Sequence, residues 1–271
     1  MTMHAAVSTP PLQIARPEPG VAVVTMNRPK SRNALSRDLM SALSEAIAAL
    51  GADEGVKAIV LAGNGPAFCA GHDLKELTAH RADADGGRAF YAETMTQCAA
   101  LMQSIVACPK PVIAAVEGIA TAAGCQLVAT SDLAVAAGTA SFATPGVNIG
   151  LFCSTPMVAL SRNVPRKRAM EMLLLGEALS AAEAVEYGLL NRVVAAGRVM
   201  ETAIDFARTI ASKSSATVAM GKATFYEQLE QPMAEAYAHA AAVMVANMML
   251  ADAKEGIGAF LDKREPKWSG C

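Results

Sequence analysis

The sequence lacks a surplus of charge of either sign, because 23 Lys and Arg residues are balanced by 25 Asp and Glu residues. A protein that binds a nucleic-acid backbone needs a basic patch, and no block of like charge stands out, so no nucleic-acid partner is expected. Aromatic residues are also scarce, at 4% of the chain, although 53% of it is hydrophobic. The 271 residues therefore predict a core of small aliphatic side chains in one large domain or two small ones.

Long uninterrupted apolar segments are missing as well. Residues 133–161 carry no charge but are interrupted by Gly and Pro, and the apolar stretch 236–251 is shorter than the roughly 20 residues of a spanning helix. We expect both stretches to lie in the interior or at a subunit interface, and we expect no membrane partner. The N-terminal segment also has no apolar core of signal-peptide length.

The six cysteines are scattered along the chain. Cys125 and Cys153 lie in apolar surroundings, which favours reduced, packed thiols over disulfides. Reduced thiols and the absence of a visible secretion signal predict a cytoplasmic protein. If the source is eukaryotic, an organelle address in the weak N-terminal segment remains an alternative.

Several catalytic signatures are absent. Gly63-x-Gly65 lacks the third glycine of a dinucleotide-binding fingerprint, there is no Gly-Lys-Ser/Thr phosphate loop, and no serine has a Gly-x-Ser-x-Gly setting. Dehydrogenase, nucleotide hydrolase and serine esterase functions are therefore excluded. Cys69-x-x-His72 has the spacing of half a metal site, but no second pair accompanies it, so we expect no metal.

Strand and helix patterns alternate through the first two thirds of the chain. Continuous apolar runs predict strands at 21–26, 58–61, 112–116 and 133–137, and continuous rather than alternating apolarity indicates strands covered on both faces. Apolar residues spaced for a helix follow Ser36, a predicted N-cap, and end at Gly51. This alternation indicates an α/β fold.

The second half of the chain is mainly helical. Pro156 and Pro165 are predicted to open two helices, and Ser180 with Glu183 forms a capping box that starts another. Further helices are expected at 200–213, 215–230 and 232–250, with a last helix capped by Asp252. The third of these is rich in Met and apolar on too many sides for a surface helix, so we expect it to pack against the core or another subunit.

Two glycine-containing segments, 63–76 and 110–127, each lie at a strand-to-helix junction. Small residues let a ligand approach the backbone, and the N–H groups at a helix start point toward developing negative charge. Two such donors would form an oxyanion hole. Spacing alone leaves open the alternative that these glycines only make tight turns.

The chain resembles the crotonase, or enoyl-CoA hydratase/isomerase, superfamily over most of its length. The matching motifs are Asn-Arg-Pro-Lys with Asn-Ala-Leu at 27–35, Ala-Phe-Cys-Ala-Gly-His-Asp-Leu-Lys-Glu at 67–76, Lys-Pro-Val-Ile-Ala-Ala-Val at 110–116, Ser-Ala-x-Glu-Ala-x-x-Tyr-Gly-Leu at 180–189 and Glu-Gly-Ile-Gly-Ala-Phe-Leu at 255–261. Residues 142–152 are similar to a segment of one branch, the enoyl-CoA hydratase domain-containing proteins.

The resemblance implies a spiral core of ββα units at 1–199, which holds an acyl-CoA pocket. Residues 1–13 of this core are expected to be flexible. A helical trimerisation region is expected at 200–271. It further implies a homotrimer or hexamer, an acyl-CoA thioester as substrate, and no cofactor beyond the coenzyme A of that substrate. By position, the oxyanion hole falls on the backbone N–H groups of His72 and Ala123. The implied substrate and CoA contacts are Arg28, Ala70, Asp73, Leu74, Lys75 and Gly124.

The family's two catalytic glutamates are replaced here, by Gln126 and Gly146. Hydration of a C=C bond requires groups that exchange protons. The Gln126 amide exchanges no proton at neutral pH, and Gly146 has no side chain. Standard two-glutamate chemistry is therefore not expected. The sequence leaves several substitutes open, which are Asp73, Glu76, Glu117, Asp132, Asn148, Cys153, Ser154 and the side chain of His72.

Two functions remain compatible with these residues. The first is an acyl-CoA-processing enzyme that stabilises a thioester enolate and carries out hydration or isomerisation with an unusual acid–base group. The second is a catalytically weak or inactive acyl-CoA-binding protein with a regulatory or scaffold role.

Overall fold

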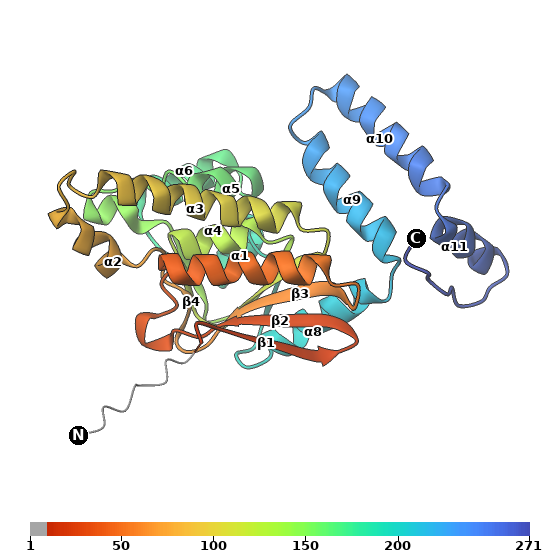
Figure 1. Ribbon diagram of the computed structural model, residues 1–271, viewed down its shortest axis with the longest axis horizontal. Coiled ribbons are helices and arrows are strands. Elements are labelled where there is room, and N and C mark those ends of the chain that lie inside the picture. The colour runs from red at the N-terminus through yellow and green to blue at the C-terminus, as the bar shows by residue number, and fades with distance from the viewer. Residues whose placement is uncertain (1–9) are drawn as a thin grey trace.

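The computed structural model describes residues 10–271, which form two β-sheets covered by helices (Figure 1). The six-stranded sheet has the spatial order β1 (Leu12–Glu18), β2 (Gly20–Met26), β3 (Val56–Gly63), β5 (Val112–Val116), β7 (Leu133–Ala137) and β10 (Arg192–Val194). The four-stranded sheet has the order β4 (Ala67–Cys69), β6 (Ile119–Thr121), β8 (Ser141–Ala143) and β9 (Leu179–Ser180).

The chain winds between the two sheets. In three successive strand pairs, the first strand belongs to the large sheet and the second to the small one; these pairs are β3–β4, β5–β6 and β7–β8. A helical segment follows each pair. Strands β4, β6 and β8 are parallel neighbours, so their carboxyl ends lie at one edge. The expected spiral of ββα units is confirmed. Most of the expected flexible lead, at 1–9, lies outside the described residues, whereas residues 12 and 13 belong to β1.

The predicted strands of the large sheet are confirmed, and so are most of the helix starts. Ser36 Oγ accepts a hydrogen bond from Leu39 N, and Ser180 and Glu183 form the reciprocal capping box. The helices of the core are α1 (Arg37–Ala52), α2 (Leu74–Ala79), α3 (Arg88–Ala107), α4 (Ala123–Thr130), α5 (Pro156–Asn163), α6 (Arg166–Leu175) and α7 (Ala181–Glu186), with short 3-10 turns η1 (Pro29–Ser31), η2 (His80–Ala82) and η3 (Pro145–Ile149).

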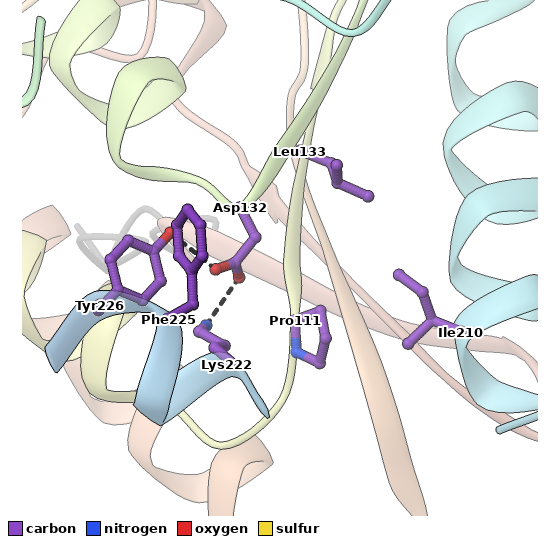
Figure 2. A pocket seen from close by; sticks show the side chains of 7 residues that line it. All are labelled: Pro111, Asp132, Leu133, Ile210, Lys222, Phe225 and Tyr226. Atoms are coloured by element: carbon purple, nitrogen blue, oxygen red, sulfur yellow. Dashed lines mark hydrogen bonds and ion pairs between the residues drawn. The ribbon is translucent and has the colours of Figure 1, made fainter. Parts of the chain in front are cut away.

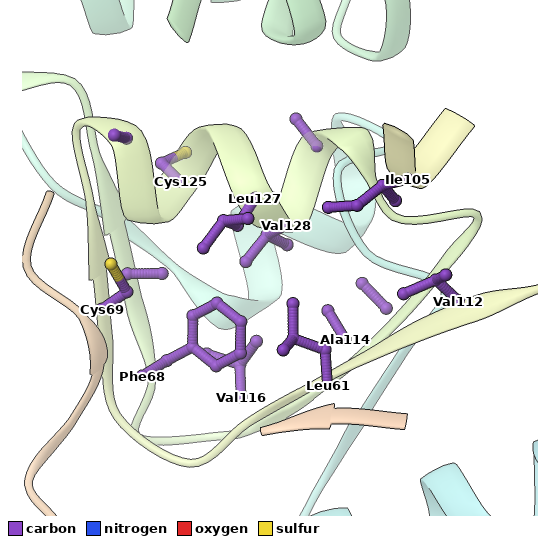
Figure 3. Close-up of a cluster of buried hydrophobic side chains, with 14 of the residues drawn as sticks. Leu61, Phe68, Cys69, Ile105, Val112, Ala114, Val116, Cys125, Leu127 and Val128 are labelled. Atoms are coloured by element: carbon purple, nitrogen blue, oxygen red, sulfur yellow. The ribbon is translucent and has the colours of Figure 1, made fainter. Parts of the chain in front are cut away.

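Helix α4 is the best-buried helix of the core, because every one of its residues is buried. Its Leu127 and Val128 side chains point toward Phe68 and Val116, as Figure 3 shows. A mainly apolar helix whose residues are all buried is stable only inside a protein. The cluster beneath α4 therefore fixes the position of its N-terminus.

Helix α8 (Val199–Ala211) packs against the opposite face of the six-stranded sheet. Its buried residues Val199, Ala203 and Ala207 are four apart, so they form one stripe that contacts the apolar side chains of β2, β3, β5 and β7. The predicted domain boundary at 199/200 falls at the start of this helix. Helix α8 thus packs with the core, and the division into a core and a helical C-terminal region stays a prediction.

Helices α9 (Ser215–Gln228), α10 (Met233–Met248) and α11 (Ala251–Leu261) extend away from the two sheets (Figure 1). No residue of α10 is buried. Its exposed apolar side chains are Met233, Tyr237, Met244, Val245 and Met248, and Met249 follows directly. The prediction that this helix packs on the chain's own core is therefore wrong, and its packing against another subunit stays a prediction.

The predicted cap of the last helix is also wrong. Leu250 occupies the N-cap position of α11, and Asp252 lies inside its first turn. The Asp252 carboxylate is 1% exposed and accepts hydrogen bonds from Ser269 N, Ser269 Oγ and Gly270 N at 2.7 to 3.0 Å. Asp252 thus ties the C-terminal tail to α11. Within residues 10–271, the longest and most apolar helices fall short of what a membrane crossing requires.

Candidate active site

The carboxyl ends of β4 and β6 bring the two glycine-containing segments together. Gly71, two residues after β4, has a φ of +86°, and a Cβ built on it would lie 2.9 Å from the Cβ of Ala122. Ala122 itself donates its N–H to the carbonyl oxygen of Ala143 at the end of β8. Three neighbouring strands therefore end around Ala122, the residue that leads into α4.

The backbone N–H groups of His72 and Ala123 have no acceptor among residues 10–271. On either side of His72, Gly71 O accepts from Leu35 N and Asp73 N donates to Leu35 O, so the His72 N–H points to the other side of the chain. Ala123 is the first residue of α4, and the first N–H groups of a helix have no partner within it. Two peptide donors are thus available at one place.

The backbone at this junction is strained. Ala122 has φ +51° and ψ −118°, a conformation that costs a residue with a Cβ about 1–3 kcal/mol. Next along, a Cβ on Gly124 would lie 2.1 Å from the carbonyl oxygen of Cys69. Only glycine permits this approach of α4 to β4. The first amides of α4 are therefore held against the His72 segment.

Gln126 and Gly146, which we expect at the positions of the family's two glutamates, lie in dense surroundings. Gln126 is 4% exposed, and its Oε1 lies 3.9 Å from Cys98 Sγ. A Cβ on Gly146 would lie 2.7 Å from Leu151 O and 2.9 Å from Cys153 Sγ. The loop after β8 therefore fills the space that a side chain at 146 would occupy.

The His72 imidazole is also part of this region. Its Nε2 atom is buried and has no hydrogen-bond partner among the described residues, and burial lowers the pKa of the ring below its usual 6.5. The ring is therefore neutral at pH 7. Thr144, which directly follows β8, is 1% exposed, and its Oγ1 likewise has no partner within residues 10–271. Nothing in the sequence pattern singles out Thr144.

The Arg28 guanidinium forms hydrogen bonds within the protein. It donates to Ser36 Oγ at 3.0 Å and to Asp73 Oδ2 at 3.1 Å, and it also bonds the carbonyl oxygen of Ala34. Asp73 in turn caps α2 by accepting from the Lys75 and Glu76 amides. These contacts stabilise the loop that carries His72, and contact with CoA stays a prediction for Arg28 and Asp73.

The remaining predicted substrate contacts line the same segment. Ala70 is half-buried at the end of β4, and its N–H bonds Arg32 O at 3.0 Å. Leu74 and Lys75, in the first turn of α2, are exposed. Their side chains are therefore accessible to a ligand that approaches the His72 loop.

Most of the substitute acid–base residues have structural partners. Glu117 accepts from Gly197 N, Glu76 from Arg37 N, and the Asn148 amide donates to Gly176 O. Ser154 bonds the carbonyl oxygen of Phe152 from an exposed turn. These contacts favour structural roles for all four residues.

The buried thiols are poor nucleophiles. Burial raises the pKa of Cys69 and Cys125 to about 12 and that of Cys98 to about 11, and it raises the pKa of Cys153 as well. Because the thiolate is the nucleophile, these side chains are inert at neutral pH. Within the described part of the chain, no three His, Cys, Asp or Glu side chains gather as a metal site.

A cavity of about 250 Å³ lies elsewhere, between α9 and the amino ends of β5 and β7 (Figure 2). There Asp132 accepts bonds from Lys222 Nζ at 2.7 Å, Tyr226 Oη at 2.9 Å and Val112 N at 2.7 Å. Lys222 also donates to two carbonyl oxygens of the core. The polar groups of this cavity thus bond one another and fasten α9 to the core.

Comparison with known proteins identifies the family. The model of the family described as Enoyl-CoA hydratase/isomerase matches residues 16–271. The chain is 48% identical over 262 residues to enoyl-CoA hydratase domain-containing protein 3, mitochondrial, from Rattus norvegicus, with 97% of this chain and 86% of the relative covered.

Two solved structures share the fold. A crystal structure of enoyl-CoA hydratase from Mycobacterium smegmatis has a TM-score of 0.91 and 52% identity, covering 96% of this chain and 99% of that one. The crystal structure of human enoyl-CoA hydratase domain-containing protein 3 has a TM-score of 0.90 and 48% identity, covering 95% and 100%.

These matches confirm the expected resemblance, including its branch. The word mitochondrial in the rat protein's name describes that protein, and for this chain a cytoplasmic location stays a prediction. The chain belongs to the enoyl-CoA hydratase/isomerase family.

Proposed function

We propose that the protein is an enzyme acting on acyl-CoA thioesters, and that the N–H groups of His72 and Ala123 hold the thioester carbonyl oxygen while an enolate forms. The observation that carries this proposal is the presence of two neighbouring peptide donors, at the ends of β4 and β6, that have no acceptor within residues 10–271. The family membership supports the substrate class.

The two donors suit an enolate for a simple electrostatic reason. Negative charge moves onto the carbonyl oxygen as the enolate forms, and fixed N–H groups stabilise it without titrating. Removing one such donor typically costs about 2.7–4 kcal/mol of transition-state stabilisation. The packing of Gly124 on Cys69 keeps these amides in place before the substrate arrives.

The reaction is a hydration or an isomerisation that does not use the two-glutamate pair. Gln126 orients a polar group but exchanges no proton, and the loop around Gly146 leaves no room for a carboxylate. The imidazole of His72 is the remaining titratable side chain at the junction that lacks a hydrogen-bond partner among the described residues. The reaction requires no metal or redox cofactor, and coenzyme A enters as part of the substrate.

The substrate would lie along the segment that follows β4. Ala70, Leu74 and Lys75 would contact the acyl-CoA beside the oxyanion hole, Gly124 would let it approach α4, and Arg28 with Asp73 would support this loop. Lys75 is exposed and positively charged, which suits a phosphate group of coenzyme A.

We also propose that the protein works as a homotrimer or hexamer. Met233, Tyr237 and Met249 on and after α10 are 74–81% exposed, and an apolar surface of this extent on one helix favours burial against other subunits. Sedimentation equilibrium would give three or six times the 28.0 kDa mass of the chain. A monomer would contradict this part of the proposal.

A second function is favoured by the closed space at Gly146. Without a second acid–base group, the protein would bind acyl-CoA without turning it over, as a regulator or scaffold. Calorimetric titration with butyryl-CoA and a hydration assay with crotonyl-CoA separate the two. Binding with turnover supports the enzyme, binding without turnover over several chain lengths supports the second function, and no binding overturns both.

A further inference from the structure

Two unpartnered polar atoms flank the proposed oxyanion hole. Within residues 10–271, only four buried side-chain nitrogen or oxygen atoms lack a hydrogen-bond partner, and two of them are Thr144 Oγ1 and His72 Nε2. Buried polar groups are nearly always paired, so each exception needs an explanation such as a bound water or ligand. Two unpaired buried polar atoms at one junction indicate that both bind the same ligand.

Both residues lie at the same edge of the four-stranded sheet. β6 pairs with β4 on one side, through Cys69 and Ala120, and with β8 on the other, through Thr121 and Ala143. His72 follows β4 and Thr144 follows β8. The two residues therefore stand on opposite sides of Ala122, whose neighbour Ala123 supplies the second N–H of the hole.

Local structure does not account for the Thr144 hydroxyl. Thr144 occupies the N-cap position of η3, where threonine usually accepts a backbone N–H, yet its side chain makes no such bond. At 1% exposure the hydroxyl does not reach bulk water either. A buried hydroxyl without a partner is unfavourable, so the Thr144 hydroxyl calls for an explanation beyond the local structure.

We propose that Thr144 Oγ1 and His72 Nε2 hold the oxygen atom that is added to, or removed from, the β-carbon of the acyl group. This inference rests on the proposed function and assigns two side chains to it. The oxygen is a water molecule in the hydration direction and the 3-hydroxyl group of the product in reverse. A hydroxyl group and a neutral imidazole together offer a donor and an acceptor, which is what such an oxygen requires.

The hydration step balances with these groups. The water oxygen forms a bond to the β-carbon, and the electron pair of the C=C bond moves to give the enolate, whose oxygen accepts from the His72 and Ala123 N–H groups. The water proton passes to His72 Nε2, and that same proton then passes to the α-carbon as the thioester carbonyl re-forms. His72 is unchanged at the end, and no oxidant or further reactant is needed.

A binding experiment tests the inference without requiring turnover. Affinities for 3-hydroxybutyryl-CoA and butyryl-CoA are measured for the unaltered protein and for Thr144→Val, with Thr96→Val on an exposed face of α3 as the matched control. One hydrogen bond worth about 1.4 kcal/mol changes an affinity tenfold. We expect the unaltered protein and Thr96→Val to prefer the hydroxylated ligand about tenfold, and Thr144→Val to lose this preference while binding butyryl-CoA as before.

Thermal unfolding of the same variants excludes a purely structural role. Because Thr144→Val removes an unpaired buried hydroxyl, we expect its Tm to stay unchanged or to rise. A lower Tm with the ligand preference retained would mean that the hydroxyl serves packing, and would overturn the inference. Equal affinity of the unaltered protein for both ligands would overturn it while leaving the proposed function intact, and binding of neither ligand would overturn both.

His72→Leu provides a second variant, because it removes the ring nitrogens and keeps the backbone N–H. We expect butyryl-CoA affinity to be retained and the rate of crotonyl-CoA hydration to fall about 100-fold or more, the usual effect of losing a proton-transfer group. Hydration at an unchanged rate would show that Nε2 exchanges no proton with the substrate, and would overturn its assigned role.

Discussion

Gly124 lies against the carbonyl oxygen of Cys69 so closely that a Cβ on Gly124 would be 2.1 Å from that oxygen. This oxygen belongs to the backbone of β4, so it cannot rotate away as a side chain would. This contact sets the distance between α4 and the His72 segment. The geometry of the proposed oxyanion hole therefore depends on one residue without a side chain.

Gly124→Ala is predicted to separate these two segments. Overpacking of this kind costs about 1–3 kcal/mol, and we expect a lower midpoint in urea unfolding together with weaker binding of butyryl-CoA. The matched control is Gly221→Ala in α9, where a Cβ would meet no atom within 4 Å. That substitution is expected to stabilise the protein by about 0.5–1 kcal/mol, and a stable, tight-binding Gly124→Ala would contradict the role assigned to this glycine.

Positions 126 and 146 are where we expect the family's two glutamates, and a glutamate is predicted to fit at position 126 only. Gln126→Glu changes one buried side chain for another of the same shape, whereas Gly146→Glu must displace Leu151 O and Cys153 Sγ. We expect Gly146→Glu to lose about 1–3 kcal/mol of stability and to gain no hydratase activity, alone or with Gln126→Glu. Crotonyl-CoA hydration and thermal unfolding check this. A stable double variant that hydrates crotonyl-CoA faster than the unaltered protein would show that the loop opens.

The ion pair between Lys222 and Asp132 is predicted to hold α9 on the core. The Lys222 and Asp132 side chains are 7% and 15% exposed, so removing one partner leaves a largely buried charge. Lys222→Met is expected to cost about 3–5 kcal/mol in chemical unfolding. For comparison, Arg162→Met breaks an exposed pair with Glu230 and is expected to cost at most about 1 kcal/mol. Equal effects of the two substitutions would refute the assigned role.

Acid is predicted to release the C-terminal tail through Asp252. Burial alone would raise the pKa of this carboxyl, but bonds from Ser214, Ser269 and Gly270 outweigh it and lower the pKa from 3.8 to about 2. A lowered folded-state pKa gives stability that is complete above about pH 4 and is lost as the pH falls toward 2.

Asp252→Asn removes this charge, so we expect a loss of about 2 kcal/mol at pH 7 and a flatter dependence of stability on pH below 4. Urea unfolding at several pH values measures both. Parallel curves for the two proteins between pH 4 and 2 would rule out Asp252 as the titrating group.

The fold could be predicted from the sequence where its signals are local. Ser36 and the Ser180–Glu183 pair are capping residues that mark the starts of their helices through contacts within one turn. The buried strands of the large sheet are continuous apolar runs. The strands β4, β6 and β8 have three residues each, which is too short for any periodicity. The small sheet that carries the site was therefore missed.

Long-range contacts explain the remaining differences. Asp252 has the sequence of a cap, but its partners lie near the C-terminus, 17 and 18 residues away. One of the partners of Arg28, Asp73, is 45 residues distant, and the Thr144 hydroxyl has no hydrogen-bond partner within residues 10–271. Backbone donors such as His72 N and Ala123 N carry no residue signature, so only the family resemblance identified them.

The carbonyl group of a bound thioester reports directly on the proposed oxyanion hole. Butyryl-CoA labelled isotopically at that carbon is bound to the protein, and its C=O stretching frequency is recorded by difference infrared spectroscopy. Ala123→Pro removes one donor at the first position of α4, where proline is tolerated, and Ser215→Pro makes the same change at the first position of α9.

Two hydrogen bonds to the carbonyl oxygen weaken the C=O bond, so we predict a lower frequency in the unaltered protein and in Ser215→Pro than in solution. In Ala123→Pro the frequency should return most of the way to the solution value. A bound thioester whose frequency equals that in water for every protein would contradict the oxyanion hole at His72 and Ala123.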